Sequence, residues 1–186
     1  MASALVKPKM TPAQFLLWER EQIDRYDFVD GQAYCMAGGT LEHSEGALSV
    51  AIALKNHLKG SPCRVFMSDV QVRVEQLGNY FYPDISVTCS PSDLVDPQAT
   101  YIAQPSLIIE VLSPSTAAYD RGDKFASLRQ LASLKEYALL DLGAQRLEVF
   151  RRNAQDRWEL FETRGSAGAA QLESVQWSGT LAQLLA

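Results

Sequence analysis

Short apolar runs bounded by turn residues follow one another through the middle of the chain. Residues 70–74 alternate cleanly between apolar and polar side chains, which predicts a half-buried antiparallel strand. Asp30-Gly31 lies between two strand-like runs, and this arrangement is a strong signal for a β-hairpin. The same pattern predicts strands at 26–29, 33–36, 64–68, 80–89, 106–112, 136–142, 146–151 and 158–163.

Helical periodicity is clearest at 41–59, where apolar residues recur every three or four positions. A second helix is predicted at 120–133, with Asp120 as its N-cap. It places Lys124 on the same stripe as Leu128 and Leu131. Shorter helices are predicted from residue 11 to about 22 and at 181–185. Residues 90–104 are predicted to be a loop, and a glycine-rich loop is predicted after the strand at 158–163. These elements predict a mixed α/β (α+β) fold with a central sheet flanked by helices, preceded by an N-terminal helix and a hairpin.

Composition limits the class of protein. With 186 residues and 47% hydrophobic content, we expect a single domain over 1–186, with 1–9 as a flexible arm. A net charge of −5 argues against a broad basic surface for non-specific binding to nucleic acid. It excludes neither a local basic groove nor a metal that neutralises acidic side chains. No window approaches the length of a membrane span, so we expect no membrane partner.

Three cysteines, Cys35, Cys63 and Cys89, are widely spaced and lie in apolar surroundings. No C-x-x-C pair is present, so a zinc site of ordinary spacing is not expected. We interpret the three as reduced core thiols, and therefore expect a cytoplasmic protein.

Two carboxylates interrupt apolar runs. Asp84 and Glu110 each lie within a predicted interior strand, where an ionised carboxylate is costly unless a cation or hydrogen-bond donors meet it. Two acids on neighbouring strands make a hard-oxygen site for Mg²⁺ or Mn²⁺, which would generate a nucleophilic water. The ammonium of Lys124 would orient that water or hold a phosphate oxygen. This set favours hydrolysis of phosphodiesters.

Simpler interpretations stay open for each residue. Asp84 fits a turn after a proline, and Glu110 fits a buried acid paired with an arginine such as Arg73. Lys124 fits a solvated i,i+4 pair with Asp120, which stabilises a helix by only about 0.2–0.5 kcal/mol.

The order of motifs resembles a known family. Tyr82-Pro83-Asp84, the run from Ile108 to Thr116 around Glu110, and Lys124 four residues after Asp120 are similar to the Uma-two family of restriction-endonuclease-like proteins. That family belongs to the PD-(D/E)XK nuclease superfamily. The resemblance extends from residue 11 to about 185 and includes His43, on the inward face of the helix at 41–59.

The resemblance implies a restriction-endonuclease-like core and Mg²⁺- or Mn²⁺-dependent cleavage of DNA. It implies Asp84 and Glu110 as metal ligands, completed by the backbone carbonyl of Val111. It also implies catalytic roles for Lys124 and for His43 as a metal-adjacent or water-positioning group. The superfamily places a lysine two residues after the glutamate, where this chain has Leu112. The resemblance therefore implies that the lysine has moved to position 124.

Two other functions stay open. Leu112 and the acidic balance also fit a non-catalytic module that binds or regulates. A two-carboxylate glycosidase would need no metal and would give Lys124 no role. A homodimer is expected by analogy, because cutting both DNA strands needs two sites and the N-terminal hairpin offers an apolar surface.

Overall fold

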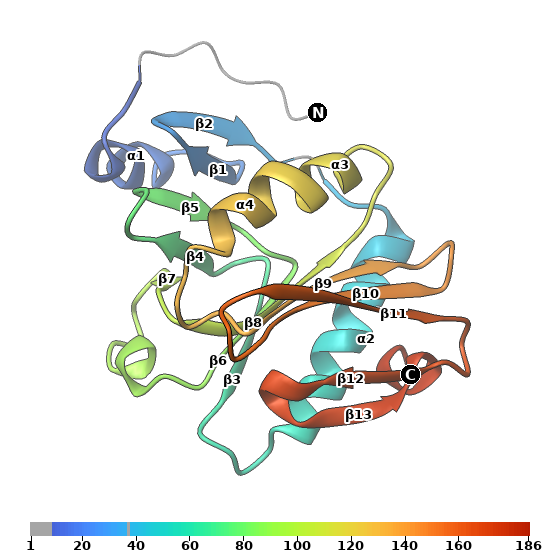
Figure 1. Cartoon of the computed structure of the whole chain (residues 1–186). Helices are drawn as coiled ribbons and strands as arrows, with labels where there is room; N and C mark the ends of the chain where they lie inside the picture. The colour runs from blue at the N-terminus through green and yellow to red at the C-terminus, as the bar shows by residue number, and fades with distance from the viewer. Residues whose placement is uncertain (1–8, 37) are drawn as a thin grey trace.

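Two sheets form the centre of the fold in the computed structural model, which describes residues 9–36 and 38–186 (Figure 1). The five-stranded sheet has the order β2-β1-β5-β4-β7 and comprises β1 (Tyr26–Val29), β2 (Gln32–Cys35), β4 (Gln71–Val74), β5 (Asn79–Phe81) and β7 (Tyr101–Ile102). The six-stranded sheet has the order β11-β10-β9-β8-β6-β3 and comprises β3 (Arg64–Met67), β6 (Ile85–Thr88), β8 (Pro105–Val111), β9 (Glu136–Asp141), β10 (Arg146–Arg152) and β11 (Trp158–Arg164).

Helices and a small third sheet complete the architecture. The helices are α1 (Pro12–Glu19), α2 (Leu41–His57), α3 (Ala117–Tyr119), the π-helix η2 (Asp120–Lys124), α4 (Phe125–Leu128) and α5 (Leu181–Leu184). The third sheet pairs β12 (Ala169–Leu172) with β13 (Trp177–Thr180), and two 3-10 turns are η1 (Pro91–Leu94) and η3 (Glu173–Val175). The mixed α/β architecture predicted from the sequence is therefore confirmed. None of the helices in the described residues is long and apolar enough to cross a membrane.

The central strands β6, β8 and β9 of the six-stranded sheet are buried on both faces, and alternation along them decides what each face contacts. Ile109 and Val111 of β8 pack with α2, α5 and the third sheet. Ile108 lies on the opposite face of β8, where it packs with α4 and with β4 and β5 of the five-stranded sheet. Glu110 shares the parity of Ile108, so its carboxylate enters the layer between the sheet and α4.

Strand register brings the two candidate acids together. β6 and β8 are antiparallel, with Ile85 opposite Ile109, so Asp84 and Glu110 are the next residues to face each other. β8 and β9 run parallel, with Glu110 beside Leu139. The expectation that the two acids come from neighbouring strands is confirmed, although Asp84 lies just before its strand rather than inside it.

The strand expected at 80–89 is two strands that belong to different sheets. β5 ends at Phe81 and β6 begins at Ile85, so residues 82–84 cross from one sheet to the other. Pro83 has no N–H to give to a strand ladder, which favours a break at this point. The continuous apolar run concealed the crossing from a pattern-based prediction.

Three further predictions need correction. The helix expected at 120–133 begins at Ala117, contains the π turn and ends at Leu128, so Asp120 is not its N-cap. The loop at 90–104 contains η1 and β7, and the segment after residue 164 contains β12 and β13. β7 has two residues and β12 and β13 have four each, so a periodicity window does not detect them. Of the predicted arm at 1–9, residues 1–8 lie outside the described part, and the single domain stays a prediction.

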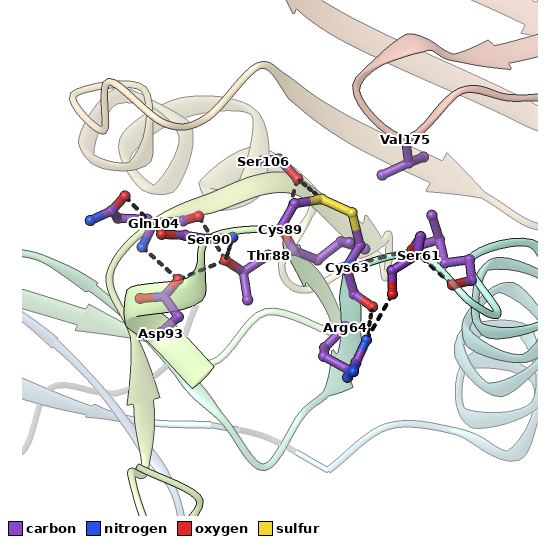
Figure 2. The surroundings of a disulfide bond; sticks show 12 residues. Ser61, Cys63, Arg64, Thr88, Cys89, Ser90, Asp93, Gln104, Ser106 and Val175 are labelled. Atoms are coloured by element: carbon purple, nitrogen blue, oxygen red, sulfur yellow. Dashed lines mark hydrogen bonds between the residues drawn. A yellow bond between two sulfur atoms is a disulfide. The ribbon is translucent and has the colours of Figure 1, made fainter. Parts of the chain in front are cut away.

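The prediction of three reduced thiols is wrong, because Cys63 and Cys89 form a disulfide (Figure 2). β3 and β6 are antiparallel, and Arg64 lies opposite Thr88, so the two cysteines face each other one position further along. Their separation of 26 residues hid this pairing in the sequence. Cys35 is a free cysteine. The expected cytoplasmic location therefore loses its support from the cysteines.

We predict that replacing Cys63 and Cys89 together by alanine lowers the free energy of unfolding by about 2–4 kcal/mol, because the closed loop restricts the unfolded chain. Urea unfolding of the oxidised protein and of the double variant measures this difference. Cys35→Ala is the matched control, because it leaves the disulfide intact. A reducing agent should lower the stability of this variant as much as it lowers that of the wild-type protein. Equal stability of the oxidised protein and the double variant would contradict the prediction.

Candidate active site

The site is built around Asp84 and Glu110, which face each other across β6 and β8. The Asp84 N–H donates to Glu110 Oε2 at 3.4 Å, and the Val111 N–H donates to Asp84 Oδ2 at 2.7 Å. The end of β8 therefore holds the Asp84 side chain through its backbone. The structure brings together the two acids that the sequence singled out.

Lys124 reaches these acids from the layer above the sheet. Its Nζ lies 2.8 Å from Glu110 Oε1 and donates to the Tyr82 carbonyl at 3.4 Å. The Lys124 side chain is only 3% exposed, so the solvated helix pair considered for it does not occur. Arg73, the alternative partner for Glu110, contacts Glu75 at 3.1 Å instead.

The π turn that carries Lys124 also buries Asp120. Asp120 Oδ1 lies 4.0 Å from Lys124 Nζ, and the Asp120 carbonyl accepts a hydrogen bond from the Tyr137 hydroxyl at 2.9 Å. Turns of this kind are rare and are frequent at functional sites. The apolar stripe predicted through Leu128 and Leu131 is buried, which explains why the lysine points inward.

Electrostatics in this layer follow from burial and from the lysine. Burial raises the pKa of Glu110 well above its usual value, and Lys124 opposes that rise. Burial alone would lower the pKa of Lys124, but Glu110, Asp27 and Asp120 outweigh it and raise that pKa. Lys124 is therefore a charged ammonium at neutral pH.

His43 approaches from the opposite face of the sheet. It lies in the first turn of α2, where its backbone N–H donates to the N-cap hydroxyl of Thr40. Its Nε2 lies 3.3 Å from Asp84 Oδ2. A Cβ at position 39 would lie 2.8 Å from His43 Nδ1. A larger residue than glycine at this position would therefore collide with the imidazole ring.

The exposed fractions give the site an open side and a closed side. The side chains of His43 and Asp84 are 22% and 16% exposed, whereas those of Glu110 and Lys124 are 4% and 3% exposed. A ligand from solvent therefore meets His43 and Asp84 first, and the Glu110–Lys124 pair lies behind them.

Two buried acids beside this set were not among the predicted site residues. Asp27 of β1 accepts a hydrogen bond from the Tyr82 N–H at 2.8 Å, and Asp120 contacts Lys124. Asp27 interrupts the run Tyr26-Asp27-Phe28-Val29. An acid within an apolar strand is the signal that also identified Asp84 and Glu110, and it was available for Asp27.

The oxygen atoms of the site fit a hard divalent cation. Glu110 Oε1 makes an ion pair with Lys124 but accepts no well-aligned hydrogen bond from the described residues, which leaves lone pairs open. Asp27, Glu110 and Asp120 are buried around one buried ammonium, so carboxyl groups outnumber the cation. No three His, Cys, Asp or Glu side chains within 9–36 and 38–186 form a metal cluster. Mg²⁺ is commonly bound through one or two carboxylates, with water and substrate completing its coordination.

Comparison with known proteins gives the family. The model of the Uma2 family, described as "Putative restriction endonuclease", matches residues 12–182. The chain belongs to the Uma2 family. The resemblance identified from the motifs is thereby confirmed.

Relatives of this Uma2 protein occur in cyanobacteria. The Synechocystis sp. protein slr1290 is 36% identical over 159 residues, which cover 86% of this chain and 83% of that protein. A second Synechocystis sp. protein, sll1609, is 29% identical over 156 residues, covering 84% and 88%. A crystal structure from Anabaena variabilis, described as a "putative nuclease belonging to DUF820", superimposes with a TM-score of 0.78. It is 17% identical and covers 95% of this chain and 97% of its own, which establishes the restriction-endonuclease-like fold.

We predict that the pKa of His43 in the metal-free protein lies above its ordinary value of 6.5, chiefly because of its hydrogen bond to Asp84. The bond stabilises the protonated ring. Its contribution to folding stability is therefore complete below pH 6.5 and is lost as the pH rises through the higher pKa of the folded protein. A titration of His43 by NMR measures the shift. Asp84→Asn should lower the His43 pKa, and His57, whose ring contacts the Val175 carbonyl, is the internal control.

Proposed function

We propose that this Uma2 protein is a Mg²⁺- or Mn²⁺-dependent endonuclease that hydrolyses phosphodiester bonds of DNA. The observation that carries the proposal is the Asp84–Glu110 pair, which the pairing of β6 with β8 sets opposite each other. Lys124 contacts Glu110 from the buried side of the site. Membership of a family described as "Putative restriction endonuclease" supports the substrate class.

Asp84, Glu110 and the Val111 carbonyl are the proposed metal ligands. A divalent cation there would polarise the phosphodiester and lower the pKa of a bound water. The protein contributes a fixed separation between the acids, because both positions are set by the register of paired strands and by the Val111–Asp84 hydrogen bond.

Lys124 is proposed to do the work of the lysine that the superfamily places two residues after the glutamate. A side chain at position 112 would share the strand face of Glu110, because strand residues alternate. Lys124 reaches that same face from η2, with Nζ 2.8 Å from Glu110 Oε1. Its charge opposes the rise that burial causes in the pKa of Glu110, and it stabilises negative charge that develops at the phosphate.

His43 is proposed to act at the open side of the site. Its ring contacts Asp84 Oδ2 and is the most exposed of the four side chains. From there it positions the attacking water and accepts a proton, as a histidine with a carboxylate partner commonly does. Asp84 fixes the orientation of the ring.

The proposal is tested with supercoiled plasmid DNA and either Mg²⁺ or Mn²⁺. Asp84→Ala and Glu110→Ala should each reduce cleavage by more than about 100-fold, because losing a direct ligand costs at least as much as losing an outer partner. Asp96→Ala, an exposed loop acid that contacts the Gln98 N–H, is the matched control and should cleave as wild type. Absence of cleavage by wild type, or cleavage unchanged in both site variants, would overturn the proposal.

We predict that Lys124→Met weakens Mn²⁺ binding most strongly near neutral pH. Without the ammonium, burial raises the pKa of Glu110 further, so a proton competes with the metal. Calorimetric titration over a range of pH measures this, and affinity should recover as the pH rises. Lys55→Met, on the exposed side of α2, is the control. An equal loss of affinity at every pH would contradict this role of the lysine.

The same titration addresses the non-catalytic alternative, which the leucine at 112 motivates. Mn²⁺ binding without cleavage would favour a binding or regulatory module. The homodimer stays a proposal that follows from a double-stranded DNA substrate. The cytoplasmic location, which was inferred from the cysteines, also stays a proposal. The hairpin does not support a dimer as expected, because Tyr26, Phe28 and Ala33 pack within the chain against α1 and β5.

A further inference from the structure

The segment from Tyr82 to Asp84 is the least regular part of the candidate site. It belongs to neither sheet. Its last residue is nevertheless tied to the six-stranded sheet, because the Asp84 carbonyl accepts the Ser68 N–H at 3.2 Å and Asp84 Oδ2 accepts the Val111 N–H at 2.7 Å. Asp84 must face Glu110 for the two carboxylates to act on one cation. Tyr82, at the other end of the crossing, has to be fixed by contacts of its own.

Asp27 supplies the first of these contacts. It lies in β1, 55 residues before Tyr82, and is 4% exposed. Its Oδ1 accepts the Tyr82 N–H at 2.8 Å, which is the backbone donor at the first residue of the crossing. The hydrogen bond ties the five-stranded sheet to the segment that carries Asp84.

Lys124 supplies the contact on the other side of the same residue. Its Nζ donates to the Tyr82 carbonyl at 3.4 Å while pairing with Glu110 at 2.8 Å. The N–H and the carbonyl of Tyr82 are thus held by Asp27 and Lys124, respectively. Pro83 follows with a restricted φ, so fixing Tyr82 restricts the direction in which the chain enters Asp84.

We propose that Asp27 is a positioning residue of the active site, which holds the crossing through the Tyr82 N–H so that the Asp84 carboxylate faces Glu110. This inference rests on the proposed function for its consequence in catalysis. Its structural content stands on the hydrogen bond between Asp27 and Tyr82. Asp27 itself does not contact the metal or the substrate in this role.

The substitutions that separate the hydrogen bond from the charge are Asp27→Asn and Asp27→Ala. Asparagine keeps an oxygen that accepts the Tyr82 N–H, whereas alanine removes the acceptor. Ala33→Gly is the matched control, because Ala33 is buried in the same hairpin, opposite Phe28, and its loss weakens the hairpin without removing the acceptor. All four proteins are compared by thermal unfolding, so that a general loss of stability is recognised.

Hydrogen–deuterium exchange of the metal-free protein tests the positioning directly. Asp27→Ala should increase exchange at Tyr82 and Asp84, beyond any change across β6 and β8, whereas Asp27→Asn and Ala33→Gly should not. Unchanged exchange at Tyr82 in Asp27→Ala would overturn the proposal. This arm needs neither metal nor DNA, so it is decided even if the wild-type protein cleaves nothing.

Calorimetry and kinetics test the consequence for the site. Asp27→Ala should weaken Mn²⁺ binding or lower kcat about 10- to 100-fold, with KM for DNA nearly unchanged, as for a group that orients a metal ligand. Asp27→Asn should restore most of the loss. If Asp27→Asn and Asp27→Ala lose affinity equally, the charge rather than the hydrogen bond is what matters, and the positioning role is wrong. If the wild-type protein does not cleave DNA but Asp27→Ala still weakens Mn²⁺ binding, the proposed nuclease activity is wrong and the positioning role of Asp27 is retained.

Discussion

The ion pair between Lys124 and Glu110 is the interaction on which the centre of this protein depends. Glu110 is buried on a central strand, and an unpaired charge there would cost several kcal/mol. Removing one partner of such a pair typically costs about 3–5 kcal/mol, since the other charge is left buried. The ammonium also attracts Asp27 and Asp120, so one cation organises acids from three separate elements.

The fold places these groups by simple rules of parity and register. Alternation along β8 directs Glu110 towards the layer of η2 and α4, while its neighbours Ile109 and Val111 pack towards α2. Antiparallel pairing with β6 then sets Asp84 opposite Glu110. His43 reaches Asp84 from α2, on the other face. The candidate site thus lies at the end of β8, where the crossing from the second sheet joins β6. Side chains from the helices on both faces of the sheet reach it there.

The sequence predicted those site residues that interrupt a run or stripe of apolar residues. Glu110 stands alone in an apolar run, and Lys124 stands on an apolar stripe, so both were identifiable from the sequence. The crossing at 82–84 was not, because its aromatic and apolar neighbours continue the strand signal. The disulfide escaped for a different reason: opposition of Cys63 and Cys89 is a property of the β3–β6 register, which no single segment encodes. Asp27 carried the right signal, but its partner is a backbone N–H, which a sequence does not display.

The π turn at Asp120–Lys124 makes the length of this helix as important as its composition. Successive residues of an α-helix are about 100° apart around its axis. Deleting a single residue from this turn would let an ordinary α-helix form. The residues on one side of the deletion would then be rotated by about 100° around the helix axis relative to those on the other side. The fold would tolerate such a deletion far better than the site, because a lysine kept in the sequence would no longer face Glu110. A gap within these five positions in a homologous chain would therefore alter the candidate site even where the lysine is kept.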